Sequence, residues 1–150
     1  MKKLTEGGFL ITKIHHLAGR IFFRMLKEYG LGDINPGQGR ILFALWKEDG
    51  IPIQELSRRT QLGKSTLTSM LDRLEQAGLL RRVPSKKDRR KILIKVTEKQ
   101  REMQRAYEEV SLEMARLFYQ GFSATEVDKF EEYLKRILDN LVKGEKDREN

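Results

Sequence analysis

Residues 64–99 read KSTLTSMLDRLEQAGLLRRVPSKKDRRKILIKVTEK, and this stretch decides the fold because its hydrophobic period changes within it. In the first part, apolar residues recur at helical spacing, which predicts a helix over residues 64–77 that ends at Gly78, a residue suited to a left-handed C-terminal cap. In the second part, residues 79–83 and 91–96 have the short, alternating character of strands. The seven residues between them are too charged and turn-prone to be buried, so they predict an exposed hairpin tip.

The residues before this stretch complete a helix-turn-helix. A two-turn helix is expected over residues 53–60, and a three-residue break, residues 61–63, separates it from the next helix. Two helices joined by a short break with glycine form a helix-turn-helix, and a basic hairpin directly after it makes a winged helix. Further helices are predicted over residues 9–29 and 36–49. The fold class is therefore mainly α with a small β-hairpin wing.

The C-terminal third predicts two more helices. The first, over residues 98–120, has a seam of apolar residues at alternating steps of four and three, which is more regular than contact with a single core requires. Ser123 and Glu126 have the spacing of a capping box that starts a final helix, whose polar tail is expected to fray from Lys143. The seam consists of Met103, Tyr107, Val110, Met114 and Leu117.

Positive charge is concentrated in the middle of the chain. The sequence holds 30 Lys and Arg against 22 Asp and Glu, a net charge of +8. Residues 51–97 alone carry 12 cations and 4 anions, which equals the whole net charge, because the +3 of residues 1–50 cancels the −3 of residues 98–150. A localised basic block in a folded region is the electrostatic pattern expected of nucleic-acid binding.

Other classes of site lack the residues they need. There is no cysteine, and the only histidines, His15 and His16, are adjacent and point about 100° apart on a helix, so no metal or cofactor is expected. No Walker-type glycine loop and no catalytic Ser-His-Asp arrangement is recognisable, so we do not expect an enzyme. No apolar run approaches the roughly 18 residues of a membrane span, and the N-terminus lacks an apolar signal core. We therefore expect a cytoplasmic protein without a membrane partner.

The second helix of the motif is expected to fit the major groove of duplex DNA, where its N-terminal side chains meet base edges. Short hydroxyls and a helix N-terminus suit bases and phosphates, and Arg73, further along, suits a phosphate. At the wing, Arg90 or Arg89 is expected to enter the minor groove, with Lys86 and Lys87 on the backbone. The recognition-helix candidates are Lys64, Ser65, Thr66, Thr68 and Ser69.

This stretch resembles the MarR-type winged-helix transcriptional regulators, and the likeness covers nearly the whole chain. Their pattern has Asp-Arg-Leu in the recognition helix, then Gly, then a wing with Asp-x-Arg. Asp88 and Arg90 match the wing, so Asp88 joins the candidate DNA-binding residues. Two positions depart from the pattern: Gln100 or Arg101 stands where a Gly is common after the second strand, and Gly63 replaces a Ser cap. The helix part is matched by Asp72, Arg73, Leu74 and Gly78.

The resemblance implies an obligate homodimer that presents two winged helices to a pseudo-palindromic operator, as a transcriptional regulator expected to be a repressor. It divides the chain into an N-terminal dimerisation helix (1–34), the winged helix-turn-helix (35–97) and C-terminal dimerisation helices (98–150). Half-sites should then lie about 10 bp apart. The alternative is that the seam from Met103 to Leu117 packs only onto its own chain. The expected dimerisation residues are Leu10, Ile14, Tyr107, Val110, Met114, Leu117, Leu134, Ile137, Leu138 and Leu141.

The resemblance also implies a small aromatic or anionic effector in the crevice between the dimer base and the winged helix. His15, beside the apolar stripe of the first helix, and Trp46 are the candidate pocket residues, although each also suits a purely structural role. A second interpretation of the chain is an RNA-binding or non-specific nucleoid-associated winged-helix protein. A regulator is distinguished from these because it prefers its own duplex site by roughly 10³ or more.

Overall fold

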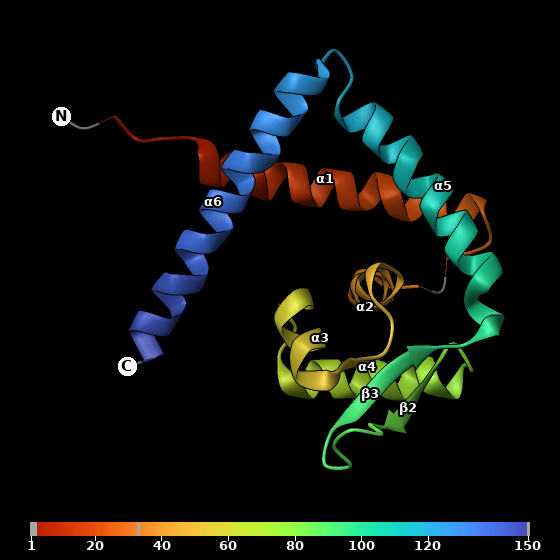
Figure 1. Cartoon of the computed structure of the whole chain (residues 1–150). Helices are drawn as coiled ribbons and strands as arrows, with labels where there is room; N and C mark the ends of the chain where they lie inside the picture. Colours follow the sequence, from red (N-terminus) through yellow and green to blue (C-terminus); the bar gives the residue numbers. More distant parts are fainter. Residues whose placement is uncertain (1–2, 33, 150) are drawn as a thin grey trace. The chain divides into compact units, whose positions relative to one another are not determined.

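The computed structural model describes residues 3–32 and 34–149. The chain forms two compact units, Met1–Ser111 and Leu112–Asn150 (Figure 1). The functional division into residues 1–34, 35–97 and 98–150 stays a prediction. Within the described ranges, none of the helices combines the length and the apolar character needed to cross a membrane. In chain order the elements are α1 (Gly7–Glu28), α2 (Pro36–Lys47), β1 (Ile51–Pro52), α3 (Ile53–Thr60), α4 (Lys64–Gln76), β2 (Leu80–Pro84), β3 (Ile92–Val96), the 3-10 helix η1 (Glu98–Gln100), α5 (Arg101–Phe118) and α6 (Ala124–Glu149).

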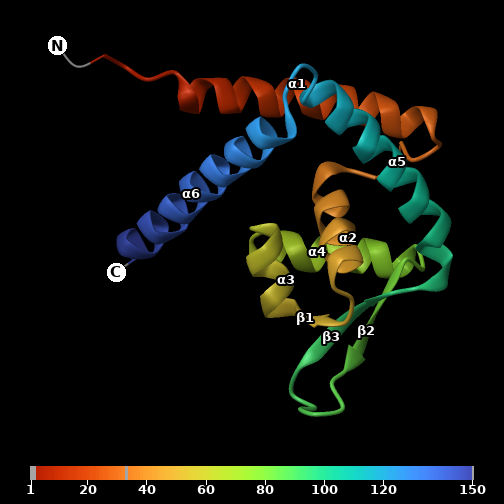
Figure 2. The same cartoon turned by 45° about the horizontal axis from the view of Figure 1, so that its top comes forward.

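Helices α2, α3 and α4 pack with the small sheet around the core of the first unit (Figure 2). Asn35 starts α2 with a full capping box: its side chain accepts from the amide of Gln38 (2.8 Å), and the Gln38 side chain accepts from the amide of Asn35 (3.2 Å). Apolar residues at helical spacing then face one common core. The buried cluster consists of Ile34, Ile41, Leu42, Ala44, Leu45, Ile51, Leu56, Leu62, Leu67, Leu71, Leu74, Leu79, Leu80 and Ile94.

The turn between α3 and α4 is fixed by local hydrogen bonds. Gln61 ends α3 in the left-handed conformation (φ 56°), and the Ser57 hydroxyl donates to the carbonyl of Leu62 (3.1 Å), whose side chain is buried. Gly63 precedes α4 without a side-chain cap. The two predicted helices and the break between them are confirmed.

The wing is an antiparallel hairpin of β2 and β3, with Leu80 opposite Val96. Both strands lie within one residue of their predicted positions. Strand β1 was not predicted. It consists of two residues, with Ile51 opposite Ile94, and gives the sheet the order β1-β3-β2. Two residues have no period to detect, and a proline suits only a sheet edge.

The first half of α5 packs within its own chain, which corrects part of the predicted dimer seam. The Tyr107 ring lies edge-on to Phe22 of α1 (centroids 5.3 Å apart) and to Trp46 of α2 (5.0 Å). Val110 is fully buried. The burial of Val110 within its own chain corrects its prediction as a dimer contact, whereas Tyr107 is only partly buried and stays a predicted one. Steps of four and three along a helix predict that a stripe is covered, but the covering helix can belong to the same chain.

The second unit contains the end of α5 and the whole of α6. The capping box is confirmed: the Ser123 hydroxyl accepts from the amide of Glu126 (3.1 Å), and the Glu126 carboxylate accepts from the amide of Ser123 (2.9 Å). The predicted fraying at Lys143 is wrong, because α6 continues to Glu149. It has no internal proline, and Gly144 costs a helix only about 1 kcal/mol. No residue of α6 is buried.

Candidate nucleic-acid interface

Helix α4 has two faces of opposite character. Leu67, Leu71 and Leu74 are buried in the core, which turns the other face to solvent. There the Thr68 hydroxyl donates to the Lys64 carbonyl (2.9 Å) and keeps its lone pairs for an outside donor. Because the N-cap has no side chain, the first amides of α4 are accessible to an anion. All of the predicted recognition residues are exposed: Lys64, Ser65, Thr66, Thr68, Ser69 and, one turn beyond, Arg73.

The wing tip is an ordered turn that presents cations. The Ser85 amide donates to the Lys91 carbonyl (2.9 Å), and the Lys91 amide donates to the Asp88 carbonyl (3.0 Å). The Ser85 hydroxyl accepts from the amides of Lys87 and Asp88 (both 3.3 Å). These bonds hold the backbone while the side chains stay in solvent. The exposed cations of the tip are Lys86, Lys87, Arg89 and Arg90.

Asp88 has a different role from its neighbours. Its carboxylate accepts from the Arg90 amide (3.1 Å) and from Arg90 Nε (3.2 Å). The Arg90 side chain, through this bond, lowers the pKa of the Asp88 carboxyl. The Arg90 side chain is nevertheless 91% exposed. Asp88 therefore orients the Arg90 side chain through these hydrogen bonds. Because its carboxylate is anionic, Asp88 is not itself a phosphate contact.

Other cations of the basic segment are neutralised inside the chain. Arg58 and Arg59 both bond the Glu55 carboxylate, and their hydrogen bonds lower the pKa of Glu55 to about 2. Arg82 of β2 pairs with Asp72 and Glu75 of α4. Sequence analysis missed this role of Arg82, because the sequence does not show that the carboxylates of Asp72 and Glu75 face strand β2. Within the described ranges, the cations that form no ion pair include Lys64, Arg73, Lys86, Lys87 and Arg89.

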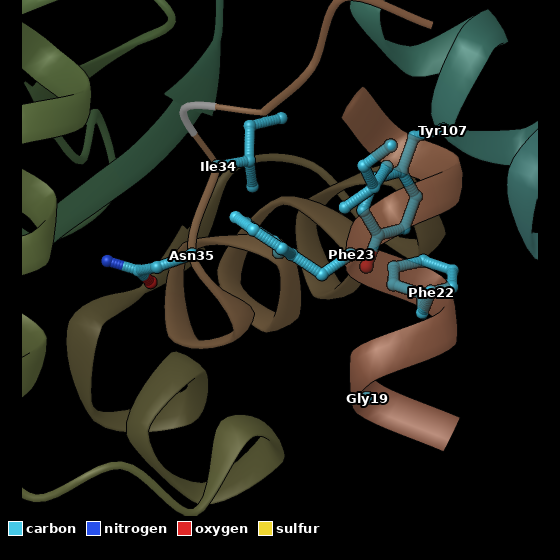
Figure 3. A pocket seen from close by; sticks show the side chains of 8 residues that line it. Gly19, Phe22, Phe23, Ile34, Asn35 and Tyr107 are labelled. Carbon is cyan, nitrogen blue, oxygen red and sulfur yellow. The ribbon is translucent and has the colours of Figure 1, made fainter. Parts of the chain in front are cut away.

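A cavity of about 140 Å³ lies in the first unit beside α1, the start of α2 and α5 (Figure 3). Neither predicted effector residue lines it. His15 is exposed on α1, and Trp46 donates its indole hydrogen to the buried side chain of Gln100 (2.5 Å). The structure therefore does not bring His15 and Trp46 together. The cavity is lined by Gly19, Phe22, Phe23, Leu26, Ile34, Asn35, Gly39 and Tyr107.

The remaining predicted dimerisation residues leave apolar surface uncovered. Met114 and Leu134 are half-buried. The others are between 43% and 66% exposed, on helices whose neighbouring turns also expose apolar side chains. Those residues are Leu10, Ile14, Leu117, Ile137, Leu138 and Leu141.

A helix-turn-helix, a solvent-facing polar face on its second helix and a hairpin tip with unpaired cations together define a winged helix-turn-helix protein. The model of the MarR family matches residues 34–92. The regulator SarZ of Staphylococcus haemolyticus is 30% identical over 100 residues, which cover 67% of each chain. The chain belongs to the MarR family.

Two further proteins are similar to this chain over different shares of its length. The regulator TtmR of Methylorubrum extorquens is 32% identical over 93 residues, or 62% of this chain. A mutant of the Escherichia coli MarR protein, solved in complex with operator DNA, is 26% identical with a TM-score of 0.68 and covers 91% of this chain and 99% of its own. The aligned stretch spans about half the length of TtmR, 46%.

Proposed function

We propose that this protein is a transcriptional regulator that binds specific sites in double-stranded DNA. The observation that carries the proposal is the exposed charge at the start of α4 and at the wing tip, where four cations, Lys64, Lys86, Lys87 and Arg89, form no ion pair within the described chain. A helix of this kind fits the major groove, and exposed arginine at a wing suits the narrow minor groove. The operator complex of a similar MarR protein supports the same choice of partner.

In this proposal, base contacts come from the recognition residues of α4, and positioning contacts come from the cations around them. Ser65, Thr66 and Ser69 are short and exposed, so they can reach base edges or phosphates. Arg73, Lys86 and Lys87 supply phosphate contacts, and Arg90 reaches the minor groove with Asp88 behind it. Because its partner is chromosomal DNA, we place the protein in the cytoplasm.

The active form is a homodimer. Isolated apolar side chains on a surface are normal, but a contiguous series on α1 and on α6 marks an interaction face. Leu10 and Ile14 recur one turn apart on α1, and Ile137, Leu138 and Leu141 do so on α6. Two copies joined through these helices present two recognition helices to one side of a duplex, with half-sites about 10 bp apart. Such a dimer covers its operator, which favours a repressor.

We further propose that the cavity beside Tyr107 takes a small neutral aromatic effector. An apolar cavity of roughly 150 Å³ accommodates benzene, and this one measures about 140 Å³. None of its eight lining residues is charged, so an anionic ligand there would lose its hydration without a partner. Burial raises the pKa of Tyr107, which keeps its hydroxyl protonated as a donor. Phenol should therefore raise the melting temperature and benzoate should not, and Phe23→Trp, which fills the cavity, should abolish the phenol effect.

The experiment that tests DNA recognition is selection of bound duplexes from a random pool, followed by affinity measurements. We expect enrichment of one inverted-repeat motif. The selected duplex should bind at least about 10³-fold more tightly than a scrambled duplex or a structured RNA. Equal affinity for the selected and scrambled duplexes would indicate a nucleoid-associated protein, and preference for the RNA would indicate an RNA-binding one; either result refutes the proposal.

A further inference from the structure

Arg82 joins the wing to the recognition helix. It lies in the middle of β2, opposite Ile94 of β3. Its guanidinium donates to Asp72 Oδ1 (2.8 Å) and to Glu75 Oε1 (2.8 Å), and its backbone amide donates to Glu75 Oε2 (3.0 Å). Its side chain is only 23% exposed. Three hydrogen bonds therefore connect the strand to the last two turns of α4.

The remaining contacts hold the hairpin mainly at its base. Beyond α4 the chain turns at Gly78, whose carbonyl accepts from the Thr97 hydroxyl (2.6 Å) at the far end of β3. On the other edge of the sheet, the Val96 amide donates to Asp49 (3.0 Å). In the described part of the chain, Arg82 makes the only ion pairs between α4 and the hairpin. Arg82 thus connects the hairpin to α4 at the middle of β2, between the base of the hairpin and its tip.

Two carboxylates already engage the Arg82 guanidinium, so this residue is poorly suited to bind a phosphate. The wing-tip cations, in contrast, lie at the far end of the same strands. A recognition helix and a wing held as one rigid body bind DNA as two linked contacts, in which the first raises the effective concentration of the second. If the hairpin swings independently of α4, each wing contact must be ordered anew on binding.

We propose that Arg82 is a positioning residue that fixes the wing relative to α4, so that both engage one DNA segment together. This inference rests on the proposed DNA-binding function. It predicts that the contribution of the wing tip depends on Arg82, although Arg82 itself does not touch DNA. Removing the connection weakens binding by loosening the tip.

The test is a double-mutant cycle on the selected duplex. One change is Arg82→Gln, and the other is a wing-tip variant that combines Lys86→Ala, Lys87→Ala and Arg90→Ala. The loss caused by the wing-tip variant should be at least about fivefold smaller in the Arg82→Gln background than in the wild type, because contacting groups couple while independent ones add. Arg82→Lys, which keeps a charge but not the fork, should restore only part of the coupling. An equal loss in both backgrounds overturns the proposal.

A second variant removes the connection from the helix side. Asp72→Asn with Glu75→Gln leaves Arg82 in place and adds net positive charge near the DNA. If Arg82 were a phosphate contact, this variant would bind the duplex as tightly as the wild type or more tightly, which contradicts the proposal. A positioning role predicts weaker binding and the same lost coupling to the wing tip.

The control is Arg101→Gln, which removes an exposed arginine paired with Glu98 (2.9 Å) outside the wing. It should leave the coupling unchanged. Melting curves of every variant identify any that do not fold, and the helix-side variant then decides. If the wild type binds no duplex selectively, the proposed function fails; if it does and the cycle is additive, only the role of Arg82 fails.

Discussion

The winged-helix region and the flanking helices differ in how much of their apolar surface is buried within a single chain. Around α2, α3 and α4, fourteen buried apolar residues form a closed core. In the 26 residues of α6 no side chain is buried, and in α1 only Leu26 is. The winged-helix region therefore buries its core within a single copy of the chain. The flanks carry apolar stripes that no other part of the described chain covers, and these are the surfaces that the proposed homodimer would bury.

Charge separates two parts of the winged helix in the same way. Arg58 and Arg59 of α3 and Arg82 of β2 are neutralised by Glu55, Asp72 and Glu75, so their charge serves the fold. At the wing tip and the start of α4, Lys64, Lys86, Lys87 and Arg89 form no ion pair within the described ranges, and Arg90 stays 91% exposed although it bonds Asp88, so their charge is available to DNA. The net charge of the segment therefore overstates the charge that meets a duplex.

The largest expected effect is a loss of stability in the core of the winged-helix region. Leu71→Ala truncates a fully buried side chain, and such a change costs about 2 to 5 kcal/mol of unfolding free energy through lost burial and a cavity. Urea unfolding followed by circular dichroism measures it. Leu4→Ala, at a residue that is 91% exposed, is the matched control and should change nothing. Equal stability of the two variants would contradict the assigned core.

The next effect is on the flanks. Leu138→Asp combined with Leu141→Asp places charges on the exposed apolar face of α6, so the dimer should dissociate while the winged helix stays folded. Sedimentation gives the mass and circular dichroism gives the fold. Lys146→Asp, on the same helix, should leave the mass at that of a dimer. If the wild type sediments as a monomer at micromolar concentration, the proposal that a second copy covers the flanking helices is refuted.

A third effect concerns the exposed charge of the wing tip. Arg90→Ala should weaken binding to the selected duplex by about tenfold or more, because a groove contact is worth roughly 1 to 3 kcal/mol, with little change in melting temperature. Fluorescence anisotropy at moderate salt measures the affinity. Arg58→Ala removes an arginine that is already paired with Glu55 and should have a much smaller effect. Unaltered binding by the Arg90 variant would exclude its minor-groove role.

The smallest effect is at the two wing lysines. Lys86→Ala with Lys87→Ala should lower affinity for all duplexes alike and reduce the slope of log affinity against log salt by up to about 0.9 for each lost phosphate contact. Titrations at several salt concentrations, on the selected and on a scrambled duplex, measure the slope. A loss confined to the selected duplex would show that the lysines contact bases instead.

The sequence predicts the winged helix well because local periods decide it. The spacing of Leu67, Leu71 and Leu74 defines α4, and the alternation of residues 92–96 defines β3. Strand β1 is not predicted, because a strand of two residues has no detectable period. Periodicity also reports only that a stripe is covered. The predicted dimer contacts on α5 therefore include Val110, which the structure buries within its own chain.

The candidate site is predicted less evenly. The exposed residues at the start of α4 and at the wing tip follow from motif order and charge. The role of Arg82 does not, because the sequence does not reveal which carboxylates face which strand. The cavity depends on contacts between distant segments, since Tyr107 lies 85 positions from Phe22. No local pattern indicates such a contact.

The most direct test of the central claim, two winged helices presented by one dimer, is the affinity for duplexes with altered half-site spacing. Inserting five base pairs between the selected half-sites rotates one of them by about half a helical turn. The two recognition helices can then no longer reach one face together, so affinity should fall by about 10²-fold or more as the second contact is lost. Equal affinity for the original and the lengthened duplex would contradict the claim.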